Sequence, residues 1–150
     1  MSTKHLIILL FLGLNFCFSQ EVKFDENLAK SLGADDYGMK QYVFCILKTG
    51  SNTTATDQER NDYFKGHMEN IQRLANEGKL AVAGPFMKND KNYRGIFVFN
   101  VATVEEAKAL VESDPAVVAK IFEYELTPWY CSAALMKVNE IHETIQKTKF

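Results

Sequence analysis

Two residues of this sequence have side chains that could transfer a proton, His67 and Asp114. His67 lies beside the apolar stripe of a predicted helix, between Phe64 and Ile71, and Asp114 lies where a second helix is expected to stop. An imidazole can act as a general acid or base, and a carboxylate that accepts a hydrogen bond from one ring nitrogen fixes the tautomer and makes the other nitrogen more basic. If the two side chains meet in space, they form a catalytic pair that needs no cofactor and no strong nucleophile.

Both residues also fit ordinary structural roles. A histidine beside a helix stripe is commonly a half-buried packing residue. An aspartate that precedes a proline commonly starts a turn and accepts hydrogen bonds from nearby backbone amides. The residue types alone leave these alternatives open.

The Gly84-Pro85-Phe86 step closes a short apolar run and supplies candidate substrate-binding residues. Glycine lets a ligand approach the backbone, and the two residues after it could form a pocket wall; an ordinary strand end is the alternative.

His67, His142 and the scattered acids show no metal-ligand spacing. The sequence also has no phosphate-binding loop, nucleophile elbow or dinucleotide fingerprint, so the predicted site contains no metal and no cofactor.

The composition describes one globular domain with a sizeable core. The chain has 150 residues, of which 47% are hydrophobic and 24% are charged, and its formal net charge is −2. No basic stripe is present, which argues against nucleic acid as a partner.

The first residues have the pattern of a secretory signal peptide. Lys4 and His5 form a short positive region, and an apolar run of signal length follows at residues 6–16, with Ser19 suited to a cleavage point before Gln20. We therefore expect an exported protein, periplasmic or extracellular, with no membrane span after cleavage. Lipidation at Cys17 is an alternative, although the residue before it is not small.

Export affects how the remaining cysteines are interpreted. Cys45 lies in one predicted strand and Cys131 follows another, so a single disulfide could form in an oxidising compartment. Two buried free thiols are the alternative, because cysteine also packs as a small hydrophobic residue.

The rest of the chain alternates between strand and helix patterns. A polar, glycine-containing segment at 20–40 is expected to be irregular. Threonine and glutamate at capping-box spacing predict helices that begin after Thr56 and Thr103, and Glu77-Gly78 should end the first of them. Apolar and β-branched runs predict strands at 42–47, 79–86, 93–101 and 117–126, and a terminal helix is expected at 135–149.

This order, strand-helix-strand-strand-helix-strand, predicts an α+β fold of the ferredoxin-like βαββαβ type. The two helices cover one face of such a sheet. The other face is expected to be apolar and open, with a second copy of the chain as its cover in a homodimer, or the terminal helix as the competing cover.

Four short pieces in this order resemble the YciI-like (YCII-related) family: residues 67–80, 83–85, 104–107 and 113–115. The resemblance extends over about residues 41–130. It implies a dimeric α+β barrel of ferredoxin-like protomers and a pocket lined by a His and an Asp, which here are His67 and Asp114. It also implies a small enzyme, in a family whose clearest reaction is a dehydrochlorination of a chlorinated hydroquinone.

The sequence thus divides into a signal peptide (1–19), an irregular arm (20–40), a YCII-related domain (41–130) and a C-terminal helical extension (131–150). The predicted function is proton transfer by His67 and Asp114 on a small aromatic or enol-type molecule, in a lyase or isomerase reaction. The alternative is a non-catalytic module that binds a small ligand or serves dimerisation.

Overall fold

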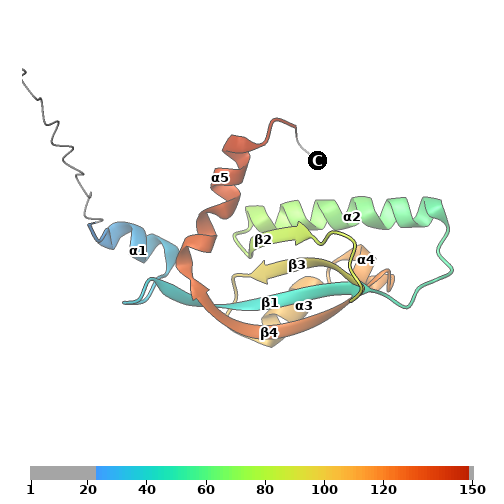
Figure 1. Ribbon diagram of the computed structural model, residues 1–150, viewed down its shortest axis with the longest axis horizontal. Helices are drawn as coiled ribbons and strands as arrows, with labels where there is room; N and C mark the ends of the chain where they lie inside the picture. Colours follow the sequence, from blue (N-terminus) through green and yellow to red (C-terminus); the bar gives the residue numbers. More distant parts are fainter. Residues whose placement is uncertain (1–22, 149–150) are drawn as a thin grey trace, which may run out of the picture.

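The structure, a computed structural model, describes residues 23–148 and contains a four-stranded antiparallel sheet with helices packed on it (Figure 1). The predicted signal peptide, residues 1–19, lies outside the described residues. The strands have the order β2-β3-β1-β4, so the first and third strands are central, as in the ferredoxin-like fold that the sequence predicts. Their bounds are β1 Met39–Thr49, β2 Leu80–Pro85, β3 Tyr93–Phe99 and β4 Phe122–Ser132.

Helices α2 (Asp57–Asn76) and α3 (Val104–Val111) begin where their sequences predict. In each, the N-cap threonine accepts a hydrogen bond from the amide of the glutamate at N3, whose carboxylate accepts one from the threonine amide. These bonds satisfy amides that helix geometry leaves without partners. The capping boxes at Thr56 and Thr103 are therefore confirmed, and Gly78, with φ +67°, follows the end of α2.

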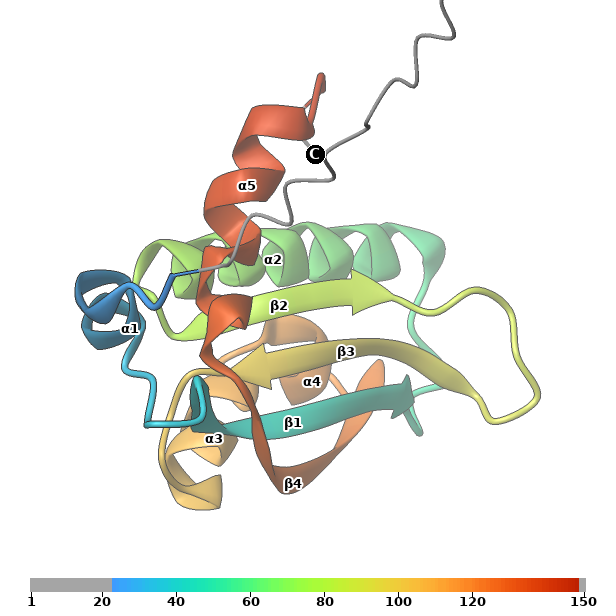
Figure 2. The same cartoon turned by 60° about the vertical axis from the view of Figure 1, so that its left-hand side comes forward.

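The main core lies between the sheet and the helices. Side chains alternate along a strand, so Val43, Cys45 and Leu47 of β1 face the helices together with Phe97 and Phe99 of β3. The helices contribute the rest of this cluster, mainly Leu74, Ala107, Val111 and Val117. Figure 2 shows α3 and α4 behind the strands, on the side opposite the C-terminal segment.

The opposite face of the sheet is only partly covered. Tyr42, Ala81 and Val98 are buried there beneath Leu135 and Met136 of the 3-10 helix η1, which follows β4. Other apolar side chains on this face are half-buried or exposed. We call them the open sheet face: Phe44, Ile46, Ile96 and Trp129.

The fourth strand starts later than its apolar pattern suggested. Residues 117–121 were expected to open it, but α4 (Pro115–Val118) and the turn after it occupy this stretch. Asp114 caps this short helix and Pro115 takes its first position, where the missing amide of proline has no cost. Val117 therefore reaches the core from a helix, and the strand assignment at 117–121 is wrong.

Both segments that flank the sheet differ from expectation. The arm at 20–40 contains helix α1 (Glu26–Leu32), which Asp25 caps at its start and Gly33, with φ +69°, at its end. The C-terminal extension consists of η1 (Ala133–Lys137) and then α5 (Val138–Ile145), and α5 rises away from the sheet (Figures 1 and 2). Between residues 23 and 148, no helix is long and apolar enough to cross a membrane.

Cys45 and Cys131 are both free thiols. Cys45 pairs with Leu126 across β1 and β4, five residues from Cys131, so the two cysteines point to opposite faces of the sheet. The disulfide alternative is therefore wrong.

Candidate active site

His67 and Asp114 are in direct contact, although 47 residues separate them in the sequence. His67 Nδ1 lies 2.5 Å from Asp114 Oδ2. His67 keeps 7% of its surface exposed and Asp114 keeps none. A hydrogen bond to a carboxylate is stronger in such surroundings than at the protein surface, because little water competes for either group.

The Asp114 carboxylate has two partners, one for each oxygen. While Oδ2 faces the imidazole, Oδ1 accepts a hydrogen bond of 2.9 Å from the amide of Ala116 and so caps α4. The structural role that the sequence allowed for Asp114 is therefore real, and it coexists with the contact to His67. The cap also fixes the carboxylate, because the helix start holds its second oxygen.

The arrangement determines which nitrogen of His67 could accept a proton. A carboxylate oxygen only accepts hydrogen bonds, so Nδ1 is the donor, and in the neutral ring Nε2 carries the free lone pair. Among the described side chains, the only fully buried nitrogen or oxygen without a hydrogen-bond partner is Asn70 Nδ2. His67 Nε2 makes no hydrogen bond to a described residue, and the His67 side chain keeps 9% of its surface exposed.

Three phenylalanines surround the imidazole. The ring centroids of Phe64, Phe97 and Phe122 lie 5.9, 5.8 and 5.1 Å from that of His67. Phe97 and Phe122 come from the sheet, whereas Phe64 precedes His67 by one helical turn and is 56% exposed. The ring is therefore held in an apolar setting with one wall at the surface.

Phe122 also lines a surface hollow of about 530 Å³ between α4 and β4, together with Lys120, Tyr124 and Glu112. Burial, and then a hydrogen bond to Glu112, raise the pKa of Tyr124 to about 12, so this phenol stays protonated at neutral pH. The hollow lies beside the aromatic surroundings of His67 and offers a mixed lining of charge and aromatic surface.

Cys45 is a buried thiol of the main core on which the charge of Asp114 acts. Burial, and then the negative charge of Asp114, raise the pKa of its thiol to about 12. Since the thiolate is the nucleophilic form, Cys45 is a packing residue at neutral pH. Proton transfer therefore suits this site better than nucleophilic attack.

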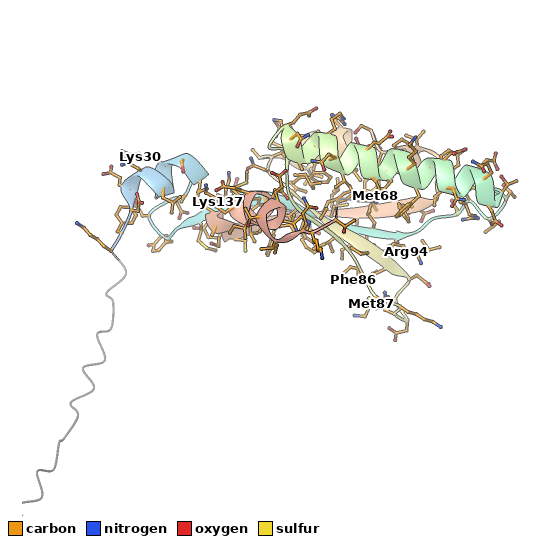
Figure 3. All side chains as sticks on the ribbon, turned by 90° about the horizontal axis from the view of Figure 1, so that it is seen from above. Lys30, Met68, Phe86, Met87, Arg94 and Lys137 are labelled. Carbon is orange, nitrogen blue, oxygen red and sulfur yellow. The ribbon has the colours of Figure 1, made fainter. Side chains whose placement is uncertain are left out.

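The three predicted substrate-binding residues lie apart from the pair. Gly84 pairs with Ile96, so it belongs to the sheet face opposite Phe97, and a Cβ added there would meet nothing within 4 Å. Phe86 packs on Tyr93 at 5.7 Å, and Figure 3 shows it on the β2–β3 connection, away from α2. In the part of the chain that the structure describes, no hydrogen bond or ring contact joins residues 84–86 to the pair, and their role in binding stays a prediction.

Sequence reasoning did not identify Phe97 or Phe122 as parts of this site. Phe64 could have been found, because it lies three residues before His67 on one helix face. The strand residues give no such signal, since only the packing of the sheet on α2 brings them near. Within residues 23–148, no group of three or more His, Cys, Asp or Glu is placed to hold a metal ion.

The fold and the site define a ferredoxin-like α+β domain with a buried His-Asp pair. A family comparison matches residues 42–130 to the YCII-related domain, and the chain belongs to this family. Among solved structures, it is similar to 5-chloro-2-hydroxyhydroquinone dehydrochlorinase (TftG) from Burkholderia phenoliruptrix AC1100, determined in complex with 2,5-dihydroxybenzoquinone. The identity is 23% and the TM-score 0.42, over 58% of this chain and 92% of that one. No curated protein sequence matches the chain significantly.

Proposed function

We propose that this protein is a small enzyme that uses His67 as general acid and base, with Asp114 as its partner, on a small aromatic or enol-type molecule. The contact between Nδ1 and Oδ2, which leaves Nε2 without a hydrogen bond to a described residue, is the observation that carries the proposal. Membership of the YCII-related family and the apolar setting of the ring support it further.

The chemistry follows from the tautomer. Nε2 takes a proton from the carbon next to a carbonyl group, the electron pair of the broken C–H bond forms a carbon–carbon double bond, and the π pair of the carbonyl moves to its oxygen to give an enolate. Asp114 stabilises the imidazolium that results. Return of the proton to another carbon completes an isomerisation, whereas departure of a leaving group with its electron pair completes an elimination.

Solvent exchange tests this proposal without a known substrate. In D₂O, we expect the protein to introduce deuterium into members of a panel of phenols, hydroquinones and 1,3-dicarbonyl compounds, followed by ¹H NMR. His67→Gln and Asp114→Asn should lower the exchange rate by about 10² to 10⁴. His142→Gln and Asp90→Asn, which change exposed residues of the same types, are matched controls that should leave it unchanged.

Two outcomes would contradict catalysis. If wild type exchanges no compound faster than His67→Gln does, the pair transfers no proton to this class of molecule. If His67→Gln alters only the affinity for a panel compound, the site is the non-catalytic binding module that the sequence also allowed.

The proposal also includes a homodimer and export. The open sheet face leaves Phe44, Ile46 and Trp129 partly accessible, and a second copy of the chain would bury them. Export rests on the pattern of residues 1–19. The intact mass of protein purified after secretion should correspond to a chain that begins near Gln20, and a mass that retains the leader would contradict export.

A further inference from the structure

Helix α2 packs closely against the start of α4 beside the proton-transfer pair. A Cβ added to Gly66 would lie 2.9 Å from Pro115 Cγ and 3.2 Å from Pro115 Cβ. Gly66 directly precedes His67, and Pro115 directly follows Asp114. The missing side chain at Gly66 therefore allows the approach of the two segments that carry the pair.

A hydrogen-bond network holds the same two segments together on the other side of the pair. Arg73 Nη2 donates to Asn70 Oδ1 at 2.7 Å and to Ser113 Oγ at 3.0 Å, and Ser113 Oγ lies 3.2 Å from Asn70 Oδ1. Asn70 and Arg73 follow His67 on α2, and Ser113 directly precedes Asp114. The corner formed by residues 113–115 is thus attached to α2 at both of its ends.

Each attachment includes one locally unfavourable feature. Glycine in the interior of a helix is less favourable than alanine, and the orientation that lets Asn70 accept from Arg73 leaves its Nδ2 buried without a described partner. Features that act against local stability while holding one contact in place are typical of functional sites.

We propose that Gly66 is a positioning residue, which lets the 113–115 corner sit against α2 while the Arg73-Asn70-Ser113 network holds the corner's other end. Together they keep Asp114 Oδ2 within hydrogen-bond reach of His67 Nδ1. This inference rests on the proposed function, since it assigns a role to residues that do not touch substrate.

Gly66→Ala tests the contact directly in the full-length protein. In wild type with ¹⁵N-labelled histidine, the Nδ1–H proton of His67 should give a downfield NMR signal that exchanges slowly with solvent. In Gly66→Ala, the clash with Pro115 should move this signal upfield and speed its exchange, and deuterium transfer to the panel should fall about 10²-fold. Lys65→Ala, an exposed neighbour on α2, is the matched control.

A second substitution provides the rescue. Pro115→Ala removes the ring atom nearest to the added methyl group, so Gly66→Ala combined with Pro115→Ala should restore the signal and much of the rate. If Gly66→Ala does not fold, Ser113→Ala, at an exposed position, should shift the signal in the same direction, and Ser113→Thr should restore it.

If Gly66 serves packing alone, Gly66→Ala changes the Tm through the contact with Pro115 but leaves the Nδ1–H signal of His67 unmoved. That result, an unmoved signal in a folded Ser113→Ala, or a double variant that is not restored would overturn the positioning role. Signal changes in a protein that turns over no panel compound would keep the positioning role and remove the proposed function. Turnover that depends on His67, together with an unmoved signal in Gly66→Ala, would keep the proposed function and remove the positioning role.

Discussion

At the scale of single residues, Asp114 has two roles, because it caps α4 and contacts the imidazole of His67. It has no exposed surface, and its two oxygens serve the cap of α4 and the imidazole of His67. A buried carboxylate with both oxygens occupied is held in one orientation, which a proton-transfer partner needs. Because the carboxylate is buried and both of its oxygens have partners, Asp114 is also important for stability.

Asp114→Ala should therefore destabilise the fold. It leaves Nδ1 of His67 and the amide of Ala116 without their acceptor, and we expect the free energy of unfolding to fall by about 2–4 kcal/mol. Urea denaturation measures the change. Asp25→Ala, which removes the exposed N-cap of α1, is the matched control, and an equal loss in both variants would show that the contact to His67 adds nothing.

Cys45 should be chemically silent in the folded protein. With its pKa raised to about 12 by burial, it carries almost no thiolate at pH 8. We expect iodoacetamide to modify Cys45 only after denaturant unfolds the chain, as peptide mass spectrometry can show. Rapid native labelling of Cys45 would mean that the core beside Asp114 opens readily.

At the scale of elements, the two capping boxes determine where α2 and α3 begin. The amide of Thr56 lowers the pKa of Glu59, and the amide of Thr103 lowers that of Glu106, below their ordinary value of 4.5. A carboxylate that is more acidic in the folded state stabilises the fold fully above its unfolded pKa, and this contribution is lost as pH falls through the folded pKa.

Glu59→Gln and Glu106→Gln should consequently lower the Tm at pH 7 and have little effect at pH 3. Glutamine keeps the capping hydrogen bond but not the charge at the helix N-terminus. Thermal unfolding followed by circular dichroism at pH 3 to 7 measures the difference. Glu143→Gln, at an exposed position of α5, is the control, and a Tm difference that stays constant with pH would contradict the assignment.

Elements with a local chemical signal were predicted well, and those that depend on context were not. The threonine-glutamate pairs and Gly78 place the ends of α2 because capping is a matter of neighbouring residues. Val117 shows the limit, since its apolar surroundings fit a strand as well as a buried helical turn. In the fold, the Asp114 cap and Pro115 decide in favour of the helix.

At the scale of the whole molecule, the open sheet face is apolar surface that a second copy of the chain would bury in the proposed dimer. Trp129 is 37% exposed, and its ring packs edge-on against Phe44 at 5.5 Å. A stable dimer buries about 1,200–2,000 Å² in total, and a sheet face of this kind is a suitable core for such an interface.

Trp129→Glu should convert the proposed dimer into monomers, because a charge would be buried at the interface without a partner. Light scattering after size-exclusion chromatography measures the mass. Val118→Glu is the control, since Val118 is 69% exposed on the helix side of the sheet. A monomeric wild type, or a Trp129→Glu variant that remains dimeric, would exclude this face as the interface.

The sequence by itself determined the βαββαβ order and the helix starts, and it singled out His67 and Asp114 as candidates, because capping and side-chain periodicity act over a few neighbouring positions. Only the tertiary structure decided that His67 and Asp114 lie 2.5 Å apart, that Cys45 and Cys131 face opposite ways, and that phenylalanines from two strands enclose the imidazole. These facts depend on strand register and on the closeness of α2 to α4 at Gly66, and packing between distant segments sets both.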